Sequence, residues 1–135
     1  MSRIVDIADL ITTYLNTEIE ELDAKRVLYF HTTSIKANDL DVVVVPLGIE
    51  SEEGDRCIDN MTYIIDVLVQ RKTSDDEDIE TLLTLCELIY LTLRNKNIEN
   101  FMIENIENNP VFDFIQMKEN KIFQGLLRLS VRAYE

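Results

Sequence analysis

The chain has 135 residues, 46% of them hydrophobic, which suits one domain over residues 1–135 that builds its own core. Its 26 acidic and 13 basic residues give a formal net charge of −13, which disfavours nonspecific binding to nucleic acid or to an anionic membrane. No stretch is long and apolar enough to predict a membrane span, and the first residues lack the pattern of a signal peptide, so we expect a cytoplasmic protein.

The first third of the chain predicts one helix and two strands. Apolar residues recur at helical spacing over residues 3–15. Residues 26–31 are aromatic and β-branched, as in a short strand. Residues 40–47 are apolar on both faces, which predicts a covered strand, and we expect Pro46 to end it because proline lacks a backbone donor.

The middle of the chain predicts a loop, a long strand and a long helix. Residues 48–56 carry four acids and two glycines, and residues 60–72 alternate as a strand whose polar face is partly covered. Ser74 or Asp75 is expected to cap a helix over residues 78–94. Three leucines make the apolar stripe of this helix wider than one sheet face needs: Leu85, Leu88 and Leu91. The helix is therefore expected either to lie between the sheet and the first helix or to meet another subunit.

The last third ends on the most regular strand pattern of the chain. Residues 98–106 fit either a strand or an irregular connection, and residues 111–120 are expected to form a surface loop. Residues 121–135 alternate between apolar and polar positions up to the C-terminus. We therefore predict an α+β fold, with a mostly antiparallel sheet of about four strands, on which an N-terminal helix and a long second helix pack.

Few residues indicate chemistry. The single histidine, His31, has no recognisable orienting partner, and Cys57 and Cys86 lack the neighbours that a zinc site or a disulfide framework needs. The acids at positions 75–78 are interpreted as helix capping rather than as a calcium site, because the glycine and the distal glutamate of such a loop are absent. We predict no catalytic, cofactor or metal site, and hence no enzyme.

Two sets of polar residues are candidates for roles other than catalysis. The acids of the 48–56 loop are interpreted first as a solvated hairpin connection and second as a projecting acidic finger; they are Glu50, Glu52, Glu53 and Asp55. Arg128 and Arg132 share the polar face of the last strand, as Asp66 and Gln70 do on the 60–72 strand. If these strands pair, cross-strand ion pairs are expected.

The order of these elements resembles that of a known family. An N-terminal helix precedes Val-Val-Val-Pro-Leu-Gly at 43–48, an acidic loop and Tyr-Ile-Ile-Asp-Val-Leu-Val at 63–69. A long helix, Glu-Asn-Asn-Pro at 107–110 and the closing Leu-Leu-Arg-Leu-Ser-Val-Arg at 126–132 follow. Over nearly the whole chain this order is similar to that of the tail terminator (minor tail, tail completion) proteins of long-tailed bacteriophages.

The resemblance implies a structural virion protein, assembled in the host cytoplasm, that forms a hexameric ring with itself at the head-proximal end of the tail tube. Such a ring stops polymerisation of the tail tube protein and offers a joining surface to the neck or head-completion protein. DNA passes through it without specific binding, for which an acidic lumen loop is suited. Leu85, Leu88 and Leu91 would then lie at a subunit interface.

Two alternatives remain open at this point. A neck or head-completion protein of the same virion would share the size and acidity, and co-fractionation with heads rather than tails would reveal it. A small-ligand-binding domain or an enzyme would need convergent polar groups in an apolar pocket, for example His31, Asp66 and Arg128 together.

Overall fold

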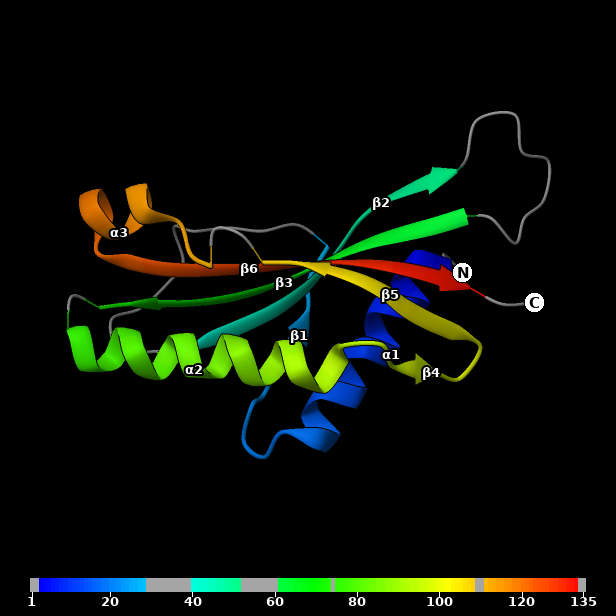
Figure 1. Cartoon of the computed structure of the whole chain (residues 1–135), viewed down its shortest axis with the longest axis horizontal. Coiled ribbons are helices and arrows are strands. Elements are labelled where there is room, and N and C mark those ends of the chain that lie inside the picture. Colours follow the sequence, from blue (N-terminus) through cyan, green and yellow to red (C-terminus); the bar gives the residue numbers. More distant parts are fainter. Residues whose placement is uncertain (1–2, 29–39, 52–60, 74, 109–110, 134–135) are drawn as a thin grey trace.

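The computed structural model of the chain describes residues 3–28, 40–51, 61–73, 75–108 and 111–133, and its fold is α+β, as predicted (Figure 1). The helices are α1 (Arg3–Glu18), α2 (Asp76–Leu93) and α3 (Phe114–Asn120). The strands are β1 (Lys25–Arg26), β2 (Asp41–Ser51), β3 (Met61–Lys72), β4 (Asn97–Ile98), β5 (Phe101–Glu107) and β6 (Ile122–Ala133). None of the three helices combines the length and the apolar character that crossing a membrane requires, within the described residues.

The six strands form one twisted sheet in the order β1-β2-β3-β6-β5-β4. Neighbours are antiparallel except β1 and β2, which are parallel. The predicted antiparallel sheet of about four strands was therefore wrong in detail, because β1 and β4 have two residues each and are too short to produce a period. The closing strand β6 lies in the middle of the sheet, between β3 and β5.

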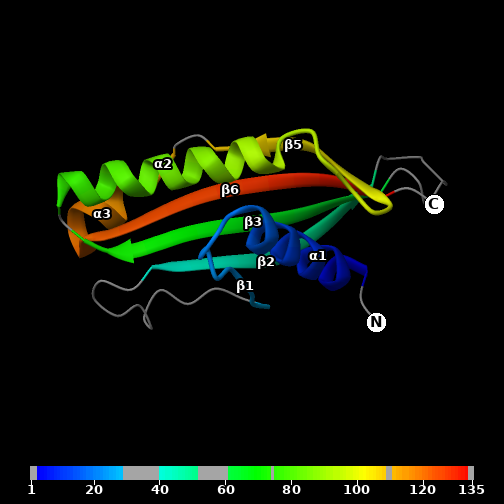
Figure 2. The same cartoon turned by 90° about the horizontal axis from the view of Figure 1, so that it is seen from below.

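One face of the sheet carries both long helices, and we call it the helix face (Figure 2). α1 packs chiefly on β2, and α2 packs on β6. The two helices lie beside each other, so α2 is not between the sheet and α1, which corrects one of the two expectations for this helix. Fully buried side chains from α1, α2, β3 and β6 meet in one core, among them Ile11, Ile65, Ile89, Leu127 and Leu129.

The second strand does not end at Pro46, contrary to the prediction, but continues to Ser51. Beyond Val44 it has β3 on one side and no partner strand on the other within the described residues. An edge position leaves the missing N–H of Pro46 without a structural cost, and the register shifts between Pro46 and Gly48. Residues 48–51 of the predicted loop are therefore strand, and residues 52–56 lie outside the described residues.

Two other segments differ from the predictions, and a third decides an alternative that the sequence left open. Residues 98–106, expected as either a strand or an irregular connection, divide into β4 and β5, whereas the predicted surface loop over residues 111–120 contains the helix α3. Asp113 caps α3 by accepting hydrogen bonds from the N–H groups of Ile115 (3.0 Å) and Gln116 (3.1 Å), and Lys121 ends it in a left-handed conformation (φ 56°). The strand expected at 26–31 is only Lys25–Arg26; residues 29–31 lie outside the described residues.

Candidate functional site

The face of the sheet opposite the two long helices carries the predicted polar groups, and we call it the open face. Side chains of alternating residues reach this face, because neighbouring residues in a strand point to opposite sides. A small second core there consists of Val43, Val45 and Leu68, with Val27 and Leu126 packed against it. α3 lies over one end of the open face, as Figure 1 shows. The polar residues that reach this face from β3 and β6 include Asp66, Gln70, Gln124, Arg128, Ser130 and Arg132.

An ion pair stands at the centre of the open face. Asp66 and Arg128 are direct partners across β3 and β6, and the guanidinium donates to both carboxylate oxygens at 2.9 and 3.1 Å. The side chain of Asp66 is 9% exposed and that of Arg128 is 41% exposed. The hydrogen bond to Asp66, followed by its negative charge, raises the pKa of Arg128 further above neutral pH. The expected cross-strand ion pair is therefore present, and it gives the nearly buried Asp66 carboxylate a partner of opposite charge.

The other predicted polar residues have different partners. Arg132 pairs with Glu104 of β5, 3.2 Å away, and not with a residue of β3. Gln70 donates to Asp41 of β2 at 3.1 Å. The side-chain oxygens of Gln70 and of its cross-strand neighbour Gln124 are buried without a hydrogen-bond partner among the described residues.

Two clefts meet at the ion pair. The first has a volume of about 490 Å³ and lies under α3; it is lined by Glu107, Phe112, Asp113, Phe114, Ile115, Gln124, Leu126 and Arg128. The second, about 420 Å³, lies along the end of β2 and shares Glu107 and Arg128 with the first. Phe112 makes an edge-to-face contact with Phe114 at 4.6 Å. Sequence reasoning missed the first cleft, because its outer wall comes from a segment that was expected to be a loop.

A pocket that favours an enzyme was expected to bring His31, Asp66 and Arg128 together. Asp66 and Arg128 are brought together, but they satisfy each other's charges, and His31 and Cys57 lie outside the described residues. Cys86 lies in α2 under the sheet, and burial raises the pKa of its thiol to about 11. At neutral pH this cysteine is a protonated, inaccessible thiol.

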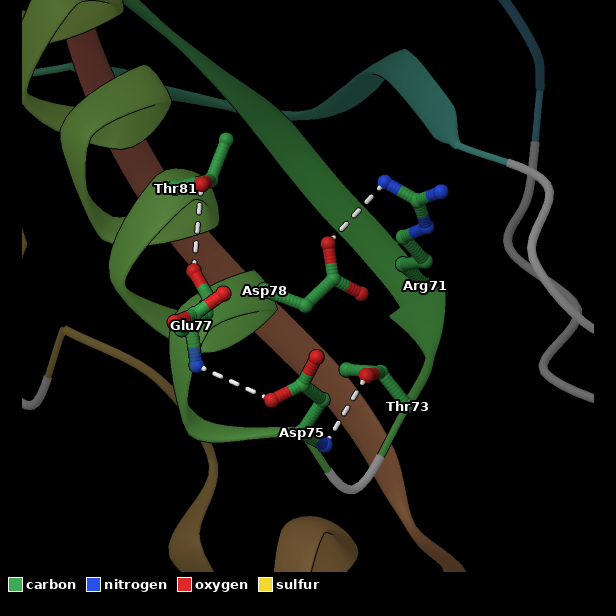
Figure 3. A network of polar contacts seen from close by, with 6 residues as sticks. All are labelled: Arg71, Thr73, Asp75, Glu77, Asp78 and Thr81. Carbon is green, nitrogen blue, oxygen red and sulfur yellow. Dashed lines mark hydrogen bonds and ion pairs between the residues drawn. The ribbon is translucent and has the colours of Figure 1, made fainter.

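The acidic run at 75–78 forms a helix N-terminus (Figure 3). Asp75 caps α2 by accepting from the N–H of Glu77 at 3.2 Å, and its own N–H donates to Thr73 Oγ1 at 3.2 Å. Asp78 pairs with Arg71 of β3 at 3.1 Å. The capping interpretation is confirmed, with Asp75 rather than Ser74 as the cap. Across the described ranges, no group of three or more His, Cys, Asp or Glu side chains could hold a metal ion.

The residues predicted to contact partners are only partly described. Glu50 is exposed near the end of β2, whereas Glu52, Glu53 and Asp55 lie outside the described residues. On α2, Leu88 is 46% and Leu91 is 51% exposed. Leu85 differs from these two, because it packs against the main core.

Comparison with known proteins adds no assignment: no protein-family model matches the sequence, and no curated protein is significantly similar to it.

Proposed function

We propose that the protein is a tail terminator of a long-tailed bacteriophage, which assembles into a ring at the head-proximal end of the tail tube and stops its polymerisation. The order of the elements in this α+β domain supports the proposal, since it includes the N-terminal helix, the β2–β3 hairpin, the long helix and the closing strand on which the resemblance rests.

The observation that carries the proposal is the distribution of exposed apolar side chains. Six of the nine large ones among the described residues lie at three separate places: the end of β2, the outer side of α2 and the start of α3. These six are Leu47, Ile49, Leu88, Leu91, Phe114 and Ile115, and the other three are Leu28, Leu40 and Val111. Apolar groups left in water at several distinct places indicate several protein contacts. A terminator subunit has this requirement, because it meets two ring neighbours, the tube below and the neck above.

The charge of the chain suits a ring through which DNA passes. A net charge of −13 repels phosphate, and the acidic stretch that starts at Glu50 joins β2 to β3. In the proposed ring this connection faces the lumen or the neck.

The experiment is electron microscopy of the cognate tail tube protein polymerised with and without this protein. We expect shorter tubes that carry a ring at one end only. Tubes of unchanged length without end density would contradict the proposal, and binding of the protein to isolated heads in the same experiment would identify a neck component instead.

A further inference from the structure

The outer side of α2, which faces away from the sheet, carries a row of uncharged side chains. We call it the α2 row, and it consists of Thr81, Thr84, Leu88 and Leu91. All four residues are exposed, Leu88 to 46% and Leu91 to 51%, and Figure 2 shows no described element in front of α2 on this side. Their spacing of three, four and three residues is that of the two inward positions of a heptad repeat, by which one helix packs against another.

The two threonines of the α2 row have their hydroxyl groups already paired. Thr81 Oγ1 donates to the carbonyl of Glu77 at 3.1 Å, as Figure 3 shows, and Thr84 Oγ1 donates to the carbonyl of Glu80 at 3.0 Å. Burying these threonines against another helix would therefore leave neither hydroxyl donor without a partner. The α2 row can thus lose its contact with water at little polar cost.

Charged residues border the α2 row on the side toward β5. They are Glu80, Glu87 and the C-cap residue Arg94, which follow one another at intervals of seven residues. Glu87 and Arg94 each line a cleft between α2 and β5, which places the border on that side. All three are exposed, and none makes an ion pair with another described residue. The border has acids toward the start of the helix and a cation at its end, so it is complementary to a copy that runs in the opposite direction.

The charges also select the direction of such a copy. Residues 75–78 at the start of α2 are all acidic, so two parallel helices would place these turns against each other. Antiparallel helices separate them. When the two α2 rows overlap over their full length, Glu80 of each copy lies opposite Arg94 of the other. One contact is unfavourable in this register, because Glu87 meets its own counterpart at the twofold axis.

We propose that two copies of this chain pair in solution through antiparallel α2 helices, with the α2 rows overlapping over their full length. Thr81 then lies opposite Leu91 and Thr84 opposite Leu88, so each leucine meets a smaller side chain. The contact is complete with two copies and does not continue into a ring. The inference therefore goes beyond the terminator function and does not rest on it. Four residues per copy make a small interface, so the dimer is weak and depends on concentration.

The test is analytical ultracentrifugation at about 0.15 M salt, which screens the repulsion between two copies of net charge −13. We expect an equilibrium between monomer and dimer at protein concentrations up to about 1 mM. Leu88→Gln should weaken the dimer about tenfold, because both copies lose apolar burial. Leu28→Gln is the matched control, since it makes the same change at a 59% exposed leucine outside α2, and it should leave the dimer unchanged. Circular dichroism checks that both variants are folded.

The register is tested by the same substitution at two positions of the border. Glu80→Gln removes the partner of Arg94 and should weaken the dimer about threefold. Glu87→Gln removes the contact between like charges and should strengthen the dimer about threefold. Both variants lose one negative charge per copy, so their opposite effects do not come from net charge.

Cross-linking gives an independent measure of the register. Glu87→Cys and Glu80→Cys are made in a Cys57→Ser background, and buried Cys86 is retained. A short bis-maleimide should join two copies of Glu87→Cys, because these positions meet at the twofold axis. Glu80→Cys should give no dimer, because its two copies are as far apart along the pair as Glu80 is from Arg94 in one helix, about 21 Å.

A monomer at every concentration, or a dimer that responds equally to Leu88→Gln and Leu28→Gln, would overturn the contact through α2. A weaker dimer with Glu87→Gln, or efficient cross-linking of Glu80→Cys, would overturn the antiparallel register. The two proposals fail separately. Capped tubes formed by a protein that stays monomeric in solution would leave the terminator function and remove the dimer, whereas a dimer that leaves tubes uncapped would remove the function alone.

Discussion

The two faces of the sheet differ in how far helices cover them and in how many apolar residues they bury. The helix face is covered by α1 and α2 and holds a continuous apolar core. The open face has a three-residue apolar core, and an ion pair and two clefts occupy its centre. The helix face therefore supplies most of the stability, whereas the open face presents polar groups and clefts. Four substitutions or titrations test this division.

The largest effect is expected for core truncation on the helix face. Leu127 is fully buried, and its neighbour in β6, Leu126, points to the open face and is only partly buried. Leu127→Ala should lower the free energy of unfolding by about 3–4 kcal/mol, through lost burial and a residual cavity. Leu126→Ala should lower it by about 1 kcal/mol. Urea unfolding followed by circular dichroism measures both, and equal losses would show that the faces do not differ in this way.

A pH titration of stability tests how completely the helix face excludes water from the Cys86 thiol. The pKa of Cys86 is raised from 9.0 to about 11 in the folded protein. Between these values the unfolded chain loses the thiol proton and the folded chain keeps it, so the free energy of unfolding should fall as pH rises through this range. The expected loss from this group is about 2–3 kcal/mol, and Cys86→Ala should remove that part of the pH dependence. Identical pH profiles for the two proteins would contradict the burial of this thiol.

The next largest effect on stability is expected at Gly125 of β6, which packs closely against Cys86 of α2. A methyl group added at Gly125 would lie 2.7 Å from Cys86 Sγ, 3.2 Å from the Phe123 ring and 3.3 Å from the carbonyl oxygen of Val111. Gly125→Ala should therefore cost about 2 kcal/mol in stability. In a Cys86→Ala background the same change should cost less than about 1 kcal/mol, because the sulfur is gone. Equal losses of stability in both backgrounds would show that the strain does not come from contact with the sulfur.

The smallest effect concerns the open face. Arg128→Gln leaves the nearly buried Asp66 without its counter-charge, so we expect a loss of about 1–2 kcal/mol in the free energy of unfolding, limited by the exposure of the guanidinium. Arg132→Gln is the matched control on the same strand and face. Its partner Glu104 is 37% exposed, so the loss should stay below about 0.5 kcal/mol. If Arg132→Gln lowered the free energy of unfolding more than Arg128→Gln does, the pair of Arg132 with Glu104 would be the more stabilising of the two.

The sequence predicts the long elements well, because periodicity over ten or more residues reports burial directly. The alternating faces of β3 and β6 were predicted correctly, and the helix cap is Asp75, one of the two residues expected for it. The short elements were missed, since two-residue strands and a seven-residue helix carry no period. The extension of β2 past Pro46 could not be predicted from local sequence, because it depends on whether a neighbour strand needs the missing N–H.

The candidate site was predictable only where it follows from strand pairing. Alternation placed Asp66 and Arg128 on polar faces, and their ion pair followed once the strands were assumed to pair. The pairing of Arg132 with Glu104 was missed, because it depends on β5, whose existence the sequence left undecided. The clefts depend on the sheet order and on the position of α3, which no single segment encodes.

The measurement that tests the central claim most directly is electron microscopy of tail tubes assembled with three proteins: the natural chain, Ile49→Lys at the end of β2 and Thr13→Lys on α1. Both substitutions place a lysine at an exposed position, so their charge changes match. We predict that the natural chain and Thr13→Lys form rings that cap the tubes, and that Ile49→Lys remains folded but forms no ring. Capping by Ile49→Lys as complete as that by the natural chain would contradict a protein contact at the end of β2, and uncapped tubes with the natural chain would contradict the terminator function itself.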